Sequence, residues 1–218
     1  AENIRDFAED KHNRVDDYPF GGDLGMLFKA GPVIRAFDSL SQDEKKPFCI
    51  MMSPKGMKFN QQMANELAKK DDIAIICGHY EGIDERVFEN ICDLEISIGD
   101  FVLTGGELGA CVVADAVLRL VNGVLSEEGS SKNETHQSPL LEYPQYTRPS
   151  TCEYGNVPEV LLSGHHKNIQ TYRRQQSLMA TLAKREDLFM EIDLTKEDIS
   201  YLDAVKQTIE KAINKNQL

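Results

Sequence analysis

The first half of the chain alternates short apolar runs with segments of helical periodicity. Residues 48–52 and 73–77 are continuous apolar runs of the length of buried strands. Between them, over residues 60–70, apolar side chains recur at the three- and four-residue spacing of an amphipathic helix. A third run, residues 94–98, leads into a glycine-containing loop and then a helix predicted over about 107–121. Strands that alternate with helices in this way predict an α/β domain with a parallel sheet.

A polar segment separates this half from the rest of the chain. Residues 126–138 contain almost no large apolar side chains, a composition typical of a linker or an active-site loop. We therefore predict three parts: an α/β domain over residues 1–125, a flexible linker over 126–138 and a second domain over 139–218.

Two helices are predicted in the second domain. Helical periodicity covers about residues 165–184 and about 197–214. Thr195 and Asp198 have the spacing of a capping box at the start of the later helix. This helix carries an apolar stripe, which we expect to pack into the core, formed by Ile199, Leu202, Val205, Ile209 and Ile213.

Composition places the chain among soluble globular proteins. With 218 residues, 41% of them hydrophobic, it can bury one sizeable core or two modest ones. No apolar run approaches the ~20 residues needed to cross a bilayer, and no signal segment opens the sequence, so we expect a cytoplasmic protein without membrane contact. The five cysteines lack CxxC spacing; they indicate neither a disulfide framework nor a zinc site and are interpreted as small buried residues.

The formal net charge of −12 limits how the protein can contact nucleic acid. Such a charge repels the phosphate backbone on average, which excludes non-specific coating of nucleic acid, so any RNA contact must be local. Residues 163–185 fit that demand, because they contain five lysines and arginines, two histidines and no acidic residue. From charge alone, an RNA contact and an ordinary solvated helix face explain this stretch equally well.

Three glycine-containing loops follow the predicted strands. They cover residues 53–56, 77–86 and 98–106, and the first is expected to be a turn that ends its strand. Ligands of open α/β sheets bind at the carboxyl ends of the strands, where such loops lie. The loops contain neither GxGxxG nor a P-loop lysine, so a phosphate site is not indicated. An adenosine-bearing ligand without phosphate fits, with Glu81 accepting from ribose hydroxyls, although each loop alone also fits an ordinary turn.

Several blocks in order along the chain carry a family resemblance. They are VDDYPFGG from Val15, CGHYEGIDER from Cys77, SIGDFVLTGGE from Ser97, LLEYPQYTRP from Leu140 and VPEVLLSGHH from Val157. Together these blocks, within a likeness that runs from about residue 3 to 188, resemble the bacterial tRNA (guanine-N1)-methyltransferases of the SPOUT superfamily. The resemblance implies a parallel sheet with a deep trefoil knot, a small mostly helical C-terminal domain, and a homodimer with the active site at the subunit interface. The family's first strand and helix precede Arg5 and do not occur in this sequence.

The resemblance also implies the reaction and the cofactor. The family transfers a methyl group from S-adenosylmethionine to N1 of the guanosine immediately 3′ of the anticodon in tRNA. The three loops are implied to form the knot that binds this cofactor in a bent shape. The positions that match the family's cofactor contacts are Met51, Met52, Ser53, Gly78, Tyr80, Glu81, Ile98, Gly99, Asp100, Phe101, Val102, Leu103, Gly105 and Gly106.

The methyl-transfer chemistry needs a base and a fixed positive charge. Guanine N1 carries a proton that must be removed, and charge building on O6 must be stabilised. The family's arginine matches Arg119, although an arginine near a helix carboxyl end also simply complements the helix dipole. The family's aspartate base is replaced by Glu134, eight residues before Glu142, and His136 is the alternative base. The sequence does not indicate whether a divalent ion takes part.

The resemblance also implies a tRNA substrate, and three other functions are possible alternatives. Candidate contacts to the phosphates of the tRNA anticodon loop are Arg148, His165, Lys167, Arg173 and Arg174. One alternative is a ribose 2′-O-methyltransferase of the same superfamily, which would not use the linker carboxylate. A second is a catalytically dead RNA-binding module, which would bind no S-adenosylmethionine. A nucleotide hydrolase is poorly supported, because no P-loop lysine is present.

Overall fold

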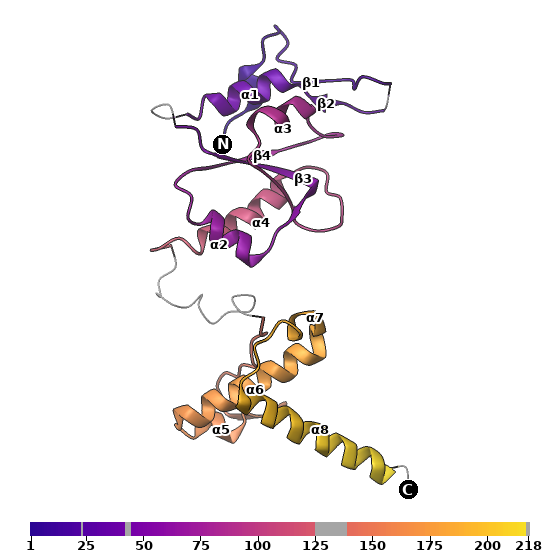
Figure 1. Ribbon diagram of the computed structural model, residues 1–218. Coiled ribbons are helices and arrows are strands. Elements are labelled where there is room, and N and C mark those ends of the chain that lie inside the picture. The colour runs from indigo at the N-terminus through magenta and orange to yellow at the C-terminus, as the bar shows by residue number, and fades with distance from the viewer. Residues whose placement is uncertain (23, 42–44, 125–138, 217–218) are drawn as a thin grey trace. The chain divides into compact units, whose positions relative to one another are not determined.

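The computed structural model describes residues 1–22, 24–41, 45–124 and 139–216 (Figure 1). The chain divides into two compact units, Ala1–Glu128 and Gly129–Leu218. Across the described residues, none of the helices combines the length and the apolar character needed to span a bilayer.

A three-stranded parallel sheet lies at the centre of the first unit. Its strands are β3 (Phe48–Lys58), β4 (Ile73–Cys77) and β5 (Leu94–Ser97), in the order β4-β3-β5. Ile50 of β3 is aligned with Ile75 of β4 and with Leu94 of β5. The predicted α/β arrangement with parallel strands is therefore confirmed.

Strand β3 is longer than the sequence predicts. Residues 53–56 were expected to end it, yet the strand continues to Lys58 with a shift in register, so that both Met52 and Met57 are aligned with Ile96. The shift depends on Gly56, because a Cβ atom at this position would lie 2.5 Å from the backbone N of Ile96. The four residues bulge out of the strand, and glycine lets the chain rejoin β5 at close range.

Short elements surround the sheet. The helices are α1 (Ala30–Asp38), α2 (Gln61–Leu67), α3 (Glu85–Ile91) and α4 (Glu107–Leu118), and the remaining elements are η1 (Ile4–Phe7), β1 (Asp16–Asp17) and β2 (Leu27–Phe28). The predicted helices α2 and α4 are confirmed with shorter bounds. Asn60 starts α2, since its side chain accepts a hydrogen bond from the Met63 N–H at 2.9 Å. The pairing of β1 with β2 is antiparallel.

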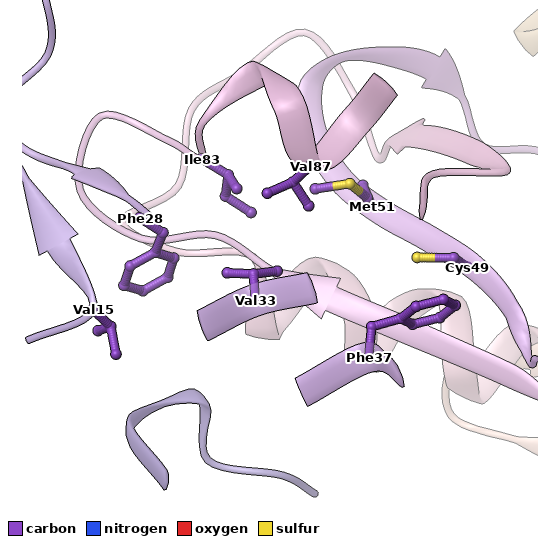
Figure 2. Packing of buried hydrophobic residues seen from close by; sticks show 8 residues of the cluster. All are labelled: Val15, Phe28, Val33, Phe37, Cys49, Met51, Ile83 and Val87. Atoms are coloured by element: carbon purple, nitrogen blue, oxygen red, sulfur yellow. The ribbon is translucent and has the colours of Figure 1, made fainter. Parts of the chain in front are cut away.

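The side chains of β3 point alternately to the two faces of the sheet and take part in two hydrophobic clusters. Cys49 and Met51 belong to one cluster, which Figure 2 shows together with side chains of α1 and α3. Ile50 belongs to the other cluster, with side chains of α2 and α4. Successive strand residues point to opposite faces, so helices cover the sheet on both sides. Burial raises the pKa of the Cys49 thiol to about 12, which keeps it protonated.

Over residues 139–216 the second unit forms a hairpin and four helices. The hairpin pairs β6 (Thr151–Cys152) with β7 (Gly155–Asn156), and the helices are α5 (Glu159–Leu162), α6 (His166–Lys184), α7 (Glu186–Phe189) and α8 (Lys196–Asn216). Leu178 and Thr181 of α6 are fully buried. The Leu141 N–H donates to the Thr181 hydroxyl at 2.9 Å, which fixes the entering chain on α6.

The predicted capping box at the start of α8 is present. The Asp198 N–H donates to the Thr195 hydroxyl at 3.1 Å, and the Thr195 N–H donates to the Asp198 carboxylate at 2.9 Å. Arg174 of α6 adds two hydrogen bonds to that carboxylate, at 3.2 and 2.8 Å. Asp198 is buried, and these bonds, the guanidinium's first, lower its pKa to about 2. This ion pair joins α8 to α6.

The expectation that the apolar stripe of α8 packs into the core is wrong for three of its residues. Ile199, Ile209 and Ile213 are each about half exposed. The capping box and the ion pair, rather than burial of the whole stripe, hold the start of α8 in place.

Replacing Asp198 with asparagine should lower the free energy of unfolding by about 2 kcal/mol at pH 7, because the carboxylate is stabilised by Arg174. A carboxyl pKa lowered on folding stabilises the protein above its ordinary value of 3.8, and this stabilisation is lost as the pH falls toward 2. The difference between the two proteins should therefore fall to about half at pH 3. Urea denaturation at several pH values measures it; a difference independent of pH would contradict the assignment.

Candidate functional site

The three predicted loops meet in one cavity. Its volume is about 520 Å³, and its wall includes residues 52–55, 78–83 and 101–106. These segments follow or interrupt the carboxyl ends of β3, β4 and β5, where ligands of open parallel sheets bind. The volume lies in the range of small-molecule sites.

Backbone contacts join the loops after β4 and β5. The Gly106 N–H donates to the Gly78 carbonyl at 2.9 Å, and His79 forms an isolated antiparallel bridge with Gly105. A Cβ atom at position 106 would lie 2.9 Å from the Cα atom of Cys77. Only glycine permits this approach without moving the backbone.

A side-chain hydrogen bond supports the same junction. His79 Nε2 lies 2.7 Å from Glu107 Oε1, within hydrogen-bond distance. A Cβ atom at Gly105 would lie 2.4 Å from the other carboxylate oxygen of Glu107 and 2.8 Å from the His79 ring. The two side chains therefore close around Gly105, and together they connect the β4 loop to the start of α4.

Strand β2 supplies a further wall of the cavity. The Phe28 N–H donates to the Gly82 carbonyl at 3.0 Å, and the Glu81 N–H donates to the Met26 carbonyl at 3.1 Å. These bonds place Leu27 in the cavity wall. Tyr80 has a left-handed backbone with φ of 61° and packs edge-on against Phe28, with ring centroids 5.4 Å apart. A non-glycine residue in this region costs about 1–2 kcal/mol, which the surrounding contacts offset.

The charges in the cavity do not suit phosphate. Glu81 and Glu85 contribute carboxylates to the wall, and Lys55 contributes one ammonium group. Ile98 and Leu103 contribute apolar surface. The cavity can therefore hold a ligand with an apolar ring and a positive charge more readily than a polyanion.

Most of the predicted cofactor residues line this cavity. They are Met52, Ser53, Gly78, Tyr80, Glu81, Ile98, Gly99, Phe101, Val102, Leu103, Gly105 and Gly106. Met51 does not; it is fully buried in the first hydrophobic cluster, because neighbours in a strand point to opposite faces. Asp100 does not either, and its carboxylate pairs with Lys58 at 2.8 Å.

Other lining residues were missed by the sequence prediction. They are Leu27, Pro54, Lys55, His79, Gly82, Ile83, Glu85, Phe88, Ile96, Ser97, Thr104 and Gly109. His79 and Thr104 lie inside quoted motif blocks and could have been chosen there. Leu27 had only a weak signal, the glycine-rich block that precedes it.

Arg119, the predicted catalytic residue that the structure describes, does not line the cavity of this chain. Arg119 caps the carboxyl end of α4, whereas Gly106, at the other end of the same helix, lines the cavity. The helix rise places these two residues roughly 20 Å apart. Glu134 and the alternative base His136 lie outside the described residues.

The predicted RNA contacts fall into different settings in the second unit. Arg148 and Arg173 line a common hollow. His165 precedes α6, with its ring Nδ1 3.0 Å from the Ser163 carbonyl, and Lys167 is exposed on the first turn of α6. Arg174 differs from them, because its guanidinium is bound to the buried Asp198 carboxylate.

Within the described parts of the chain, no cluster of three or more His, Cys, Asp or Glu residues could hold a metal ion.

Comparison with known proteins points to one enzyme family. The family model described as tRNA (Guanine-1)-methyltransferase TrmD matches residues 1–191. A protein of Ruminiclostridium cellulolyticum is 58% identical over 190 residues, which cover 87% of this chain and 82% of that protein. One of Carboxydothermus hydrogenoformans is 53% identical over 196 residues, covering 90% and 77%. One of Clostridium perfringens strain 13 is 51% identical over 200 residues, covering 92% and 84%. All three are named tRNA (guanine-N(1)-)-methyltransferase.

Replacing Gly106 with alanine should lower the free energy of unfolding by about 1–3 kcal/mol, because the new methyl group meets the Cys77 backbone. Gly31 is the matched control. An alanine there gains helix propensity near the start of α1, but its Cβ atom would lie 3.1 Å from the Arg35 guanidinium, which is bonded to the Phe7 carbonyl, so this variant should lose less stability than Gly106→Ala. Equal stability of the two variants in urea denaturation would show that the junction tolerates a side chain.

Proposed function

The chain belongs to the tRNA (guanine-1)-methyltransferase family, and from this membership we propose that it methylates N1 of the guanosine immediately 3′ of the anticodon in tRNA, with S-adenosylmethionine as methyl donor. The observation that carries the proposal is the single cavity formed by the three loops. The relatives' names favour the guanine-N1 reaction over the ribose and RNA-binding alternatives.

The cavity fits this donor. When bound, S-adenosylmethionine supplies an electrophilic methyl group on a sulfonium sulfur. Glu81 and Glu85 can face the positive charge, while Ile98, Phe101 and Leu103 offer apolar surface to the adenine ring. The glycines at the loop junction bring backbone N–H and carbonyl groups to the ligand. We further propose that these loops form the family's trefoil knot, which the close contact between the β4 and β5 loops supports.

The chain's own residues supply the proton transfer. Glu134 removes the proton from guanine N1, so that the ring nitrogen can attack the methyl carbon while the sulfur–methyl bond breaks and its electron pair stays on the sulfur, leaving a neutral thioether. A carboxylate with an ordinary pKa of about 4 is a weak base for this proton. Arg119 compensates by binding the negative charge that develops on guanine O6, for which its planar guanidinium is suited.

The position of Arg119 supports an active site shared between two copies of the chain. It lies roughly 15 Å along α4 from Gly109, the residue of this helix nearest to it that lines the cavity of its own chain, too far for contact with a base bound there. One face of α4 also exposes Leu108, Val112 and Leu118, which are each about half exposed or more. We propose that a second copy covers this face and that Arg119 serves the cavity of the partner.

The RNA contacts are proposed for the second unit. Arg148, His165, Lys167 and Arg173 are candidates for phosphate binding, because all four are exposed. Arg174 is better explained as the residue that joins α6 to α8 through Asp198.

Replacing Glu134 with glutamine should lower the turnover number by about 10²–10⁴-fold, because the amide cannot accept the proton. The affinity for S-adenosylmethionine should not change. Glu134→Asp, which restores the family's residue, should remain active, and Glu128→Gln is the matched control from the same segment. Methylation of an unmodified tRNA transcript, followed by mass analysis of its nucleosides, measures the effect. Loss of activity in His136→Ala with activity kept in Glu134→Gln would give the role to His136.

A shared active site predicts complementation between two inactive variants. Glu81→Lys puts a second positive charge in the cavity and should prevent donor binding, while Arg119→Ala removes the electrophile. Mixed subunits should recover about a quarter of the wild-type activity, because half of the dimers are mixed and each has one intact site. If Arg119 acted in its own chain, the mixture would be as inactive as either variant alone.

A further inference from the structure

The second unit contains a hollow of about 460 Å³ lined in part by residues of its helices α5 and α6. Its wall is formed by the segment 143–148, by residues of α5 and by Arg173 of α6. Two tyrosines and two arginines line it, and none of its lining residues is acidic. In a chain with a net charge of −12, this is a local site of positive charge.

A hollow of the same volume in the first unit serves as a contrast. Its three lysines, Lys45, Lys46 and Lys70, lie among four carboxylates, those of Asp71, Asp72, Glu89 and Asp93. Because the four carboxylates outnumber the three lysines, that hollow does not favour an anion. The hollow in the second unit is therefore the better candidate for a negatively charged ligand.

The two tyrosines of this hollow differ in their surroundings. The Arg173 guanidinium carbon lies 4.6 Å from the centroid of the Tyr143 ring, which is a cation–π contact. Tyr146 is 50% exposed. Part of the Tyr146 ring is therefore accessible to a ligand.

We propose that this hollow binds one unpaired nucleotide of the RNA substrate, whose base stacks on Tyr146 while Arg148 and Arg173 contact its phosphates. The proposal rests on the proposed function, which makes tRNA the substrate. Proteins recognise single-stranded RNA by stacking bases on aromatic rings and guanidinium planes, with arginines along the backbone. A phosphopeptide would use the arginines but would not need the accessible ring.

The test is the affinity of the full chain for an unmodified tRNA transcript. Tyr146→Ala should weaken binding about tenfold, as expected for the loss of one base stack. Tyr146→Phe keeps the ring and should bind within about twofold of wild type. Tyr154→Ala is the matched control, because this tyrosine is 90% exposed between β6 and β7 and does not line the hollow.

Salt dependence separates stacking from charge. Arg148→Gln should weaken binding and make the slope of log affinity against log salt less steep by about 1, the change expected for the loss of one phosphate contact. Tyr146→Ala should leave this slope unchanged. Binding of Tyr146→Ala equal to that of wild type would overturn the proposal.

Two further measurements keep the outcomes distinct. Nucleoside mass analysis of wild-type product tests the proposed function on its own: N1-methylguanosine together with unaltered binding by Tyr146→Ala would reject the nucleotide pocket alone. Should Tyr146→Ala fail to fold by circular dichroism, ultraviolet cross-linking of the wild-type complex decides. A nucleotide attached to the peptide 143–148 supports the pocket, and its absence from that peptide overturns it.

Discussion

The first unit depends on the position of β3 between two parallel strands. This strand is paired on both edges and covered on both faces, so it has no solvent-facing side. Its successive residues therefore pack alternately against one layer of helices and against the other. Cys49 and Met51 meet α1 and α3, and Ile50 meets α2 and α4. The same parallel arrangement brings the carboxyl ends of all three strands to one edge. The cavity exists there because the core requires this topology.

The sequence predicted the elements with a clear hydrophobic period and missed the others. Strand β4 and helix α6 have the expected bounds, because an apolar run and a long amphipathic pattern are unambiguous signals. Helix α3 spans seven residues and begins inside a glycine-containing motif, so its periodicity was hidden. Strands β1 and β2 have two residues each and exist through long-range hydrogen bonds, which no local pattern encodes.

For the candidate site, the sequence predicted the loops but not every side chain that faces the cavity. Motif blocks identified the loops, but a block does not tell which neighbours face the ligand, so Met51 was included and His79 was left out. Arg119 was assigned from its place in a motif, and the length of α4 then separated it from the cavity. Two ligand environments of opposite character also emerge: carboxylates around the first cavity and arginines around the hollow of the second unit.

The register shift in β3 has a consequence for how this fold can be varied. Since Met52 and Met57 are aligned with the same residue of β5, the residues between Met52 and Gly56 can change in length or composition, provided that Gly56 still lets the chain rejoin β5. Three of these bulged residues, Ser53, Pro54 and Lys55, form part of the cavity wall. The fold thus contains an exchangeable segment at its binding site, where selectivity for a ligand could be redesigned without rebuilding the sheet.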